Sequence, residues 1–501
     1  MLRMKFNFFI LLFVVFMLSC EGLTDDQSTP QPPSDENLAP GDFSVKVDSV
    51  SYNKAYLSWE KSIDPEGFKV FYSIRLGDSL VIKDIRENYA ILENLEGSKN
   101  YKGIVISEDP QGNSVSADFE FTTKKDYQTF LKYLNFHMDR ECISGFIQHL
   151  FETPDGNFLA VGKTSENGSN FFNYVAKIDP LGNPIWMKTY PYENGNVWEI
   201  RANLTESGLI IVSNHYVINL DHEGNEIWVK YMERFNIGVE GVEIKDIVQS
   251  ANGEFYLIGD YNSDNPDIFQ PGIIMKLSPS GEVLWEKFFE GSISRIITGK
   301  ENDLWIIGSK EVNGCTQEES NSGYCDQIDF WLVRLNLNGE ILWEKTYGDT
   351  NHDLPYYLIQ LDNGNLVFGG TSIGPSQTYA ARILEVDQSG ELIFDHVDEH
   401  SYFFSIRETP DRGLITVGME SAYAYQRKLG LVKFDANRSK EWSKSYGDYT
   451  TSIYGYDLLV DQEGFRIAAS RQNMIAFDCD EKLLFIKTDP WGYFEIPSPT
   501  D

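Results

Sequence analysis

Asp179-Pro-Leu-Gly182 followed by Trp186, and Asn336-Leu-Asn-Gly339 followed by Trp343, are two copies of an element that recurs along most of the chain. Asp or Asn opens a turn, Gly supplies the positive φ that the turn needs, and the aromatic ring lies at a fixed height on the next strand. A lysine follows most of the aromatics by two positions, so that its stem shares the face of the ring while its ammonium reaches water. The remaining copies, one with Arg in place of Gly and the last without an aromatic strand, are Asp221–Gly224 with Trp228, Ser278–Gly281 with Trp285, Asp387–Gly390 with Phe394, Asp435–Arg438 with Trp442, and Asp489–Gly492.

A second element precedes each copy of the first and consists of a turn that enters an apolar run. Because the run does not alternate with polar residues, it predicts a strand buried on both faces. Its copies are Pro154–Gly162, Glu206–Val212, Ala251–Gly259, Glu301–Gly308, Asp362–Gly369, Pro410–Gly418 and Asp461–Ala468. Each repeat of about 42 to 58 residues thus holds four strands, which is typical of a propeller blade.

The seventh repeat reaches Gly492 and lacks its aromatic strand. Phe130-Leu-Lys132-Tyr-Leu134, ahead of the first repeat, matches the missing strand. We therefore expect residues near 128–136 to complete the seventh blade and close the ring, which removes an open sheet edge. The predicted fold is all-β, with a β-sandwich over 41–124 and a seven-bladed β-propeller over 125–501 closed by an N-terminal strand.

The segment 41–124 contains about seven short alternating runs separated by turn residues, the pattern of a sandwich. Trp59 is placed to fill the space between two sheets, and Tyr101 to bond back to the loop after Leu95. This segment resembles a fibronectin type III domain. The resemblance implies a spacer, with ligand binding as the alternative.

The Gly-x-x-x-Trp spacing resembles the docking motif of quinoprotein-like propellers with pyrroloquinoline-quinone-type repeats, which include non-enzymatic outer-membrane lipoproteins. The segment from Asp to Gly is one residue shorter here than in the quinone enzymes. The resemblance implies that the repeat tryptophans pack blade against blade; stacking on a ligand is the alternative.

Residues 1–19 have two cations and an apolar run of the length of a secretory signal peptide. Leu18-Ser19-Cys20 resembles a bacterial lipoprotein signal, which implies lipidation of Cys20; an ordinary signal peptide with an incidental cysteine is the alternative. The segment 20–40 is acidic and proline-rich, as expected of an extended tether. Acidic residues behind the cysteine resemble the export signal of Bacteroidetes-type surface lipoproteins, which implies an outer-membrane protein at the cell surface, or alternatively one that faces the periplasm.

The charge composition excludes two classes of binding partner. The chain has 42 Lys+Arg against 76 Asp+Glu, a net charge of −34, so that nucleic acid and anionic lipid headgroups are repelled. We expect membrane attachment through the lipid anchor only, and a monomer. Hydrophobic residues make up 42% of the chain, enough for a large core.

The cysteines and acidic clusters give few candidate metal sites. Cys315 and Cys325 bracket a polar insertion and are predicted to form a disulfide in an exported protein. Asp260, Asn262 and Asp264 alternate like the start of a calcium loop but lack its later ligands, so a solvated acidic loop is favoured. Seven histidines without paired spacing argue against a transition metal. Cys142 and Cys479, in the first and last repeats, either pair or stay as buried thiols.

Loops that lead into the inner strands of a propeller gather around its channel, and here they are rich in aromatic and polar residues. Such side chains suit a sugar ring or a peptide, but they also build propeller cores. The candidate ligand-binding residues are Tyr192, His352, Asp353, Tyr356, Tyr402 and Tyr454. No nucleophile elbow or phosphate loop is found. We expect binding of a protein or carbohydrate without catalysis or cofactor; the alternative is a glycan-active or quinone-dependent enzyme with its site on the channel face.

Overall fold

The structure is a computed structural model. It describes residues 37–134, 143–166, 170–191, 200–213, 215–232, 242–261, 271–313, 327–349, 351–374, 379–399, 401–422, 426–447, 451–473 and 482–494.

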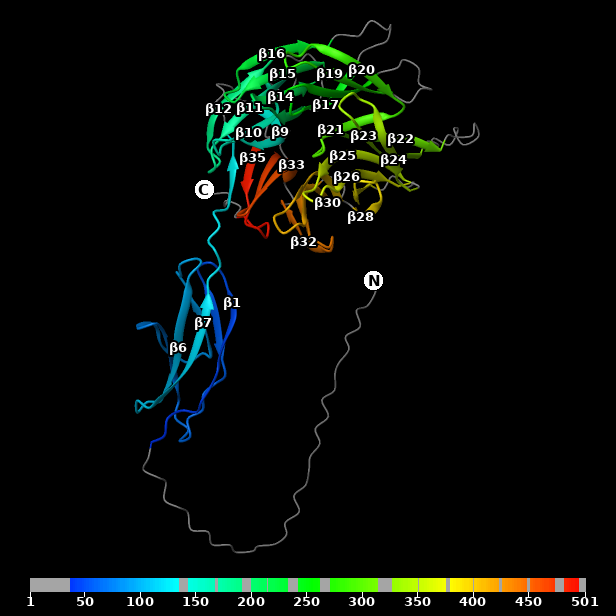
Figure 1. Ribbon diagram of the computed structural model, residues 1–501. Helices are drawn as coiled ribbons and strands as arrows, with labels where there is room; N and C mark the ends of the chain where they lie inside the picture. Colours follow the sequence, from blue (N-terminus) through cyan, green and yellow to red (C-terminus); the bar gives the residue numbers. More distant parts are fainter. Residues whose placement is uncertain are drawn as a thin grey trace, which may run out of the picture. The chain divides into compact units, whose positions relative to one another are not determined.

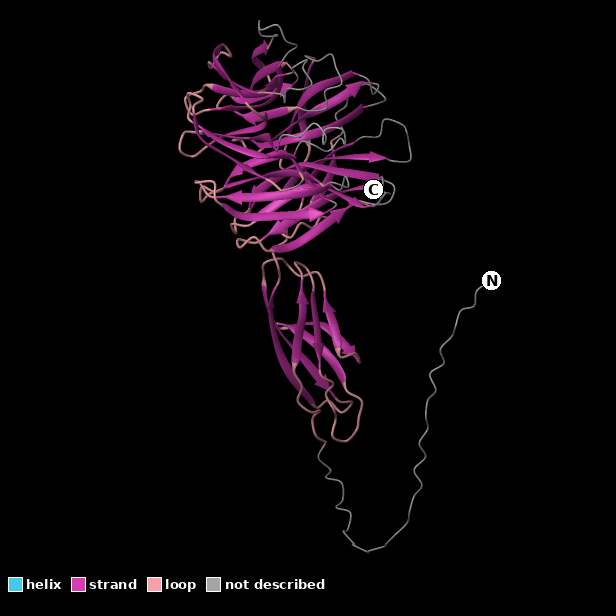
Figure 2. Cartoon of the chain, turned by 90° about the vertical axis from the view of Figure 1, so that its right-hand side faces the viewer, coloured by secondary structure: helices cyan, strands magenta, loops and turns pink. Residues whose placement is uncertain are grey.

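The described part of the chain is all-β and consists of many small antiparallel sheets, as Figure 2 shows. No helix occurs in it, and hence none that could cross a membrane. The chain divides into two compact units, Met1–Asp126 (unit 1) and Tyr127–Asp501 (unit 2).

Unit 1 contains seven strands, as the sequence predicts, in one three-stranded sheet (β1-β2-β5) and one four-stranded sheet (β4-β3-β6-β7). The strands are β1 (Val45–Val50), β2 (Ala55–Trp59), β3 (Phe71–Leu76), β4 (Ser79–Ile85), β5 (Tyr89–Leu92), β6 (Asn100–Glu108) and β7 (Ser114–Thr122). Trp59 is buried in a core formed by both sheets and lies 5.3 Å from the Tyr72 ring. The Tyr101 hydroxyl accepts a hydrogen bond from Glu96 N–H (2.7 Å), which confirms the predicted bond back to the loop.

The described residues of unit 2 form seven four-stranded antiparallel sheets, numbered 1 to 7 in chain order. Sheets 1 to 3 are formed by β9 (Ile143–Glu152), β10 (Phe158–Glu166), β11 (Asn170–Ile178), β12 (Pro184–Tyr190); β13 (Arg201–Leu204), β14 (Gly208–Ser213), β15 (Tyr216–Asp221), β16 (Glu226–Tyr231); and β17 (Val242–Gln249), β18 (Phe255–Tyr261), β19 (Gly272–Leu277), β20 (Val283–Phe289). Sheets 4 to 6 are formed by β21 (Ser292–Thr298), β22 (Leu304–Asn313), β23 (Gln327–Leu335), β24 (Ile341–Tyr347); β25 (His352–Gln360), β26 (Leu366–Ile373), β27 (Tyr379–Val386), β28 (Leu392–Glu399); and β29 (Ser401–Glu408), β30 (Leu414–Ala422), β31 (Gln426–Phe434), β32 (Lys440–Tyr446). Sheet 7 joins β33 (Thr451–Asp461), β34 (Gly464–Asn473) and β35 (Lys482–Lys487) to β8 (Phe130–Tyr133).

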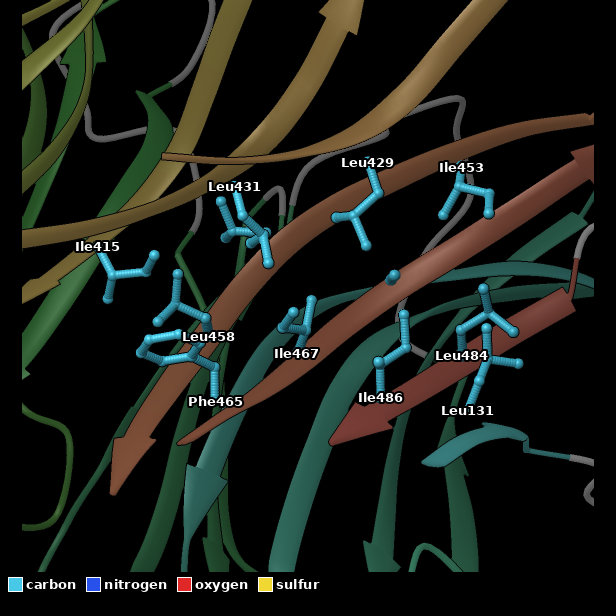
Figure 3. Close-up of a cluster of buried hydrophobic side chains, with 12 residues drawn as sticks. Leu131, Ile415, Leu429, Leu431, Ile453, Leu458, Phe465, Ile467, Leu484 and Ile486 are labelled. Atoms are coloured by element: carbon cyan, nitrogen blue, oxygen red, sulfur yellow. The ribbon is translucent and has the colours of Figure 1, made fainter. Parts of the chain in front are cut away.

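The fourth strand of sheet 7 comes from the beginning of unit 2. Leu131 of β8 is the register partner of Ile486 in β35, which confirms the predicted pairing of the two ends of the repeat region. Figure 1 shows the red β35 beside the cyan strands. Leu131 packs with Leu484 and Ile486, and this cluster continues into Leu429 of sheet 6 (Figure 3).

Each repeat tryptophan packs against the turn of the following sheet, which confirms that these residues pack between repeats. A Cβ built on Gly339 of sheet 4 would lie 2.6 Å from Cη2 of Trp285 in sheet 3. The same relation joins Trp186 to Gly224, Trp228 to Gly281, Trp343 to Gly390 and Trp442 to Gly492. At the closure, a Cβ on Gly182 would lie 2.9 Å from the ring of Phe130, so β8 replaces the missing aromatic strand in this contact as well.

The lysine after the aromatic also contacts the neighbouring turn. Lys188 Nζ lies 5.3 Å from the centroid of the Trp186 ring, as expected from their shared face. Its ammonium does more than reach water, because it donates to Glu223 O of the next sheet (2.7 Å). Lys287 likewise donates to Asn338 O (2.6 Å). The ring and the lysine of one strand therefore both contact the turn of the next sheet.

Replacing Gly339 with Ala is expected to destabilise unit 2 by about 2 kcal/mol more than replacing Gly156 with Ala. Both residues have positive φ, 72° and 77°, so both variants carry the same backbone strain. Only Gly339 faces a neighbouring indole, since nothing lies within 4 Å of a Cβ at Gly156. Urea midpoints of the two variants measure the difference; equal midpoints would contradict the role of the indole contact.

The first strands of the seven sheets contact one another in a closed cycle. β9 contacts β13, β13 contacts β17, and the series continues through β21, β25, β29 and β33 back to β9. This cycle positions the site described below.

Candidate functional site

One cavity of about 450 Å³ is lined by the first strands of all seven sheets. Each strand contributes at least one side chain to it, among them His149, Arg201, Asp246, Arg295, Tyr356, Phe404 and Asp457. The volume lies within the range of about 300–1,000 Å³ that is typical of small-molecule sites.

A β-bulge shapes the lining in six of the seven first strands. The unpaired residues at the register shifts are Gln148, Lys245, Ser294, Tyr356, Phe404 and Tyr456. Opposite each bulge, the second strand carries a small residue, namely Gly162, Gly259, Gly308, Gly370, Gly418 and Ala469. A Cβ on Gly162 or Gly418 would collide with a carbonyl oxygen of the bulged strand. The glycine that ends the apolar run therefore permits the bulge, and the bulge re-aims side chains toward the cavity.

Three of the bulge residues, Tyr356, Phe404 and Tyr456, form an aromatic arc on consecutive sheets 5, 6 and 7. The Tyr356 and Phe404 ring centroids are 6.1 Å apart, and those of Phe404 and Tyr456 are 6.0 Å apart with an angle of 27° between the planes. Phe146 of sheet 1 continues the series, 6.0 Å from Tyr456.

Five residues that follow a bulge position form a polar belt with Arg201 of β13, which has no bulge: His149, Asp246, Arg295, Ser405 and Asp457. Its carboxylates join neighbouring sheets, because Asp246 accepts a hydrogen bond from Ile296 N–H (3.2 Å) and Asp457 accepts one from Leu150 N–H (3.1 Å).

Asp457 of the belt is buried. Besides Leu150 N–H, its carboxylate accepts hydrogen bonds from Ser405 Oγ (2.7 Å), Arg407 Nη2 (2.7 Å) and Leu458 N–H (2.8 Å). It thus connects sheets 6, 7 and 1.

His149 lies beside Asp457, with 3.9 Å between His149 Nδ1 and Asp457 Oδ2. Its Nε2 is 3.0 Å from Ile200 O. Burial, followed by the positive charge of Arg201, lowers the pKa of His149 to about 4, despite the opposing effect of Asp457. The imidazole is therefore neutral at pH 7 and adds no charge to the cavity.

We expect His149→Gln to weaken the acid sensitivity of unit 2. In the unfolded chain the histidine binds a proton at its ordinary pKa of about 6.5, whereas in the folded chain it does so only near pH 4. Its contribution to the free energy of unfolding, up to about 3 kcal/mol, is therefore present above pH ~6.5 and lost as pH falls toward ~4. Urea midpoints between about pH 7 and about pH 4.5 should therefore fall less steeply in the variant than in the wild type. His215→Gln removes another imidazole that bonds a neighbouring carbonyl and serves as the control. An unchanged slope in His149→Gln would contradict the lowered pKa.

The structure separates the residues predicted as ligand-binding. Tyr356 lines the cavity. Tyr454 contacts a lining residue, Tyr456, and the centroids of these two rings are 6.4 Å apart. Tyr402 does not line the cavity. Its ring centroid is 5.9 Å from that of Tyr379, and the Arg427 guanidinium lies over its ring, 6.0 Å from the centroid.

Asp353 and His352 lie at the start of β25 and do not line the cavity. Asp353 is fully buried, 3.1 Å from Arg382, which also pairs with Asp395 (2.8 Å). Burial raises the pKa of Asp353 to about 7 against the opposing effect of Arg382. His352 is partly buried.

Asp260 is a structural residue in the described part of the chain and not part of a solvated loop. It is buried at the end of β18 and accepts hydrogen bonds from Ser292 Oγ (2.6 Å) and Ile293 N–H (2.9 Å) of sheet 4. Among the described residues no three metal-ligating side chains come together. The other predicted site residues lie outside the described residues: Cys20, Cys142, Tyr192, Asn262, Asp264, Cys315, Cys325 and Cys479.

Sequence reasoning missed most of the lining, including Arg201, Arg295, Phe404 and Asp457. A signal exists for Arg295 and Phe404, because Gly308 and Gly418, which end apolar runs, lie opposite the bulges of their sheets. Sheet 2, with Arg201, has no bulge, and sheet 7, with Asp457, has Ala469 in place of the glycine. The register that connects the two strands is needed to use it.

No protein-family model and no curated protein matches the chain. Among solved structures, it is similar to a protein of unknown function from Bacteroides caccae, with 16% identity over 55% of this chain and 90% of that chain and a TM-score of 0.35. It is also similar to the fibronectin type III domain of human fibronectin type III domain containing protein 3, with 24% identity over 19% of this chain and 94% of that chain and a TM-score of 0.17. A mutant of Synechocystis apocarotenoid oxygenase is similar at 10% identity over 72% of this chain and 90% of that chain, with a TM-score of 0.36. These similarities are consistent with a β-rich fold and do not indicate a function.

Proposed function

We propose that the seven sheets of unit 2 are the blades of a β-propeller closed by β8, and that unit 1 is a fibronectin type III-like sandwich that serves as a spacer. The closed cycle of contacts among the first strands supports the first assignment. The three-plus-four arrangement of strands, with the Trp59 core and the Tyr101 bond, supports the second.

We further propose that the propeller binds a protein or glycan ligand in its central cavity without catalysis. The observation that carries this proposal is the aromatic arc in a cavity lined by all seven sheets. Aromatic faces in a concave site suit a sugar ring or an apolar side chain. Asp246 and Asp457, the carboxylates of the lining, bind backbone amides of adjacent sheets, which favours a structural role over acid–base chemistry.

Binding of the full-length chain, purified in detergent, to an array of glycans and peptides tests this proposal. Tyr356→Ala and Phe404→Ala should each weaken binding about tenfold or more, as expected for central aromatic residues. Tyr89→Ala removes an exposed tyrosine of unit 1 (60% exposed) and should leave binding unchanged. Product analysis of the same mixtures covers the enzyme alternative, since turnover of any bound glycan would contradict a function limited to binding.

We also propose that the chain is a surface lipoprotein of the outer membrane, with a signal peptide over 1–19, lipidated Cys20 and a tether over 20–40. The apolar run ending at Leu18-Ser19-Cys20 supports this. Cys20→Ser should release the protein from the membrane fraction, and protease added to intact cells should digest the anchored wild type. A Cys20→Ser variant that stays with membranes would contradict lipid anchoring; protection from protease would indicate a periplasm-facing protein.

A further inference from the structure

The lining of the cavity is chemically divided. The aromatic arc belongs to sheets 5, 6 and 7, whereas Arg201 and Arg295 lie on the first strands of sheets 2 and 4. Because the first strands follow one another in a closed cycle, a ligand in the cavity meets the aromatic arc on one side and Arg201 and Arg295 on the other. The third arginine of the lining, Arg407, lies on sheet 6 and pairs with Asp457 (2.7 Å).

The charges of the lining favour an anion. The described lining residues include three arginines, Arg201, Arg295 and Arg407, and two carboxylates, Asp246 and Asp457. Arg407 pairs with Asp457 (2.7 Å), and both carboxylates also accept backbone hydrogen bonds. The whole chain has a net charge of −34 and repels anions at long range. Guanidinium groups among the described lining residues of such a chain therefore favour a ligand whose negative charge is recognised at short range.

The backbone of the lining disfavours an extended peptide. Peptides commonly bind by adding a strand to an exposed sheet edge. Here several backbone donors of the first strands are bound by side chains of adjacent sheets: Ile200 N–H donates to Gln148 Oε1 (2.7 Å), Leu150 N–H to Asp457 and Ile296 N–H to Asp246. Recognition in this cavity thus depends on side chains.

We propose, as an extension of the proposed binding function, that the cavity takes an acidic saccharide, whose uronic-acid carboxylates pair with Arg201 and Arg295 while its pyranose faces lie against the aromatic arc. A guanidinium matches a carboxylate with two parallel hydrogen bonds. Aromatic rings offer the apolar faces on which the C–H faces of a sugar pack, and Tyr356, Phe404 and Tyr456 line the cavity.

The test compares acidic oligosaccharides with their neutral equivalents on the full-length chain in detergent. Galacturonate, mannuronate–guluronate and glucuronate-containing oligosaccharides are each paired with the carboxyl-reduced form, which keeps the ring and removes the charge. We expect at least one acidic saccharide to bind about tenfold or more tightly than its reduced form, and the preference to shrink with added salt. Neither measurement depends on a variant.

Variants then locate the charge recognition. Arg201→Gln and Arg295→Gln should each lower affinity for the acidic saccharide about tenfold, and by more than they lower affinity for the reduced form. Arg201→Lys should restore part of the loss, because it keeps the charge without the planar fork. Arg86→Gln removes the same charge from unit 1 and is the control. Circular dichroism and the urea midpoint of each variant report its folding.

The outcomes separate this inference from the proposed function. Equal affinity for acidic and reduced saccharides would overturn the inference and leave glycan binding intact. Tighter binding of sulfated saccharides or acidic peptides than of any uronate would overturn it too, because the arginines would then recognise a different anion. Failure of every saccharide and peptide to bind would overturn the proposed function as well.

Discussion

Replacing Leu131 with Asp is expected to lower the free energy of unfolding of unit 2 by about 3–5 kcal/mol. Leu131 is 7% exposed and packs in β8 against Leu484 and Ile486 of β35. An aspartate there loses the apolar contacts and either buries a charge or takes up a proton, and each is unfavourable. Tryptophan fluorescence in urea reports this unfolding, because every tryptophan except Trp59 lies in unit 2.

The matched control is Leu342→Asp. Leu342 also lies on the outer strand of a sheet, β24 of sheet 4, but its side chain is 53% exposed. The same change of residue should therefore alter stability by no more than about 0.5 kcal/mol. Equal stability of the two variants would show that β8 buries no side chain that unit 2 needs.

Asp457→Ala is expected to cost unit 2 a similar amount, about 3–5 kcal/mol, because buried donors lose their acceptor and the half-buried Arg407 loses its carboxylate. Arg407 would lose its carboxylate partner at 2.7 Å, and Ser405 and Leu150 N–H would lose an acceptor. Since these groups belong to sheets 6 and 1, the substitution loosens two junctions at once. The urea midpoint of unit 2 measures the loss.

Two further variants test whether the loss arises from the lost buried hydrogen bonds and the unpaired guanidinium. Asp435→Ala makes the same truncation in an exposed turn, where the carboxylate accepts hydrogen bonds from Asn437 N–H and Ser439 N–H, and should cost about 1 kcal/mol. Adding Arg407→Met to Asp457→Ala should recover part of the loss, because the unpaired guanidinium is removed. Equal losses for Asp457→Ala and Asp435→Ala, or no recovery in the double variant, would refute this account.

The order of strands could be predicted from the sequence because its determinants are local. Gly339 has a positive φ and leaves no room for a Cβ beneath Trp285, so neither residue is freely replaced. The same reasoning placed β8, since Phe130 and Lys132 repeat the aromatic–lysine spacing and Phe130 lies over Gly182. Arg438 departs from this pairing of glycine and tryptophan. It stands in place of the glycine and keeps a positive φ of 66°, and the aromatic residue of the preceding repeat is Phe394 instead of a tryptophan.

The lining of the cavity could be predicted only in part because it depends on register. Tyr356 was identified, but Phe404 was missed and Tyr402 chosen, since the sequence does not show that a bulge places Phe404 in the lining. Asp353 resembles a site residue in the sequence. Its partner, Arg382, lies 29 residues away on β27, and the burial of this pair follows from packing that no local pattern encodes.

A disulfide between β8 and β35 tests the closure of the seven sheets most directly. In a chain whose native cysteines are replaced by serine, Leu131→Cys is combined with Ile486→Cys, its register partner. Paired residues of antiparallel strands have Cα atoms about 4.5–5.5 Å apart, within the range a disulfide spans. Ile467 is the partner of Ile486 on the other side, so Leu131→Cys with Ile467→Cys is separated by two strand spacings, about 10 Å, and is the control. We predict a cross-linked peptide from the first pair and none from the second; absence of the first cross-link, or equal yields from both pairs, would contradict the closure.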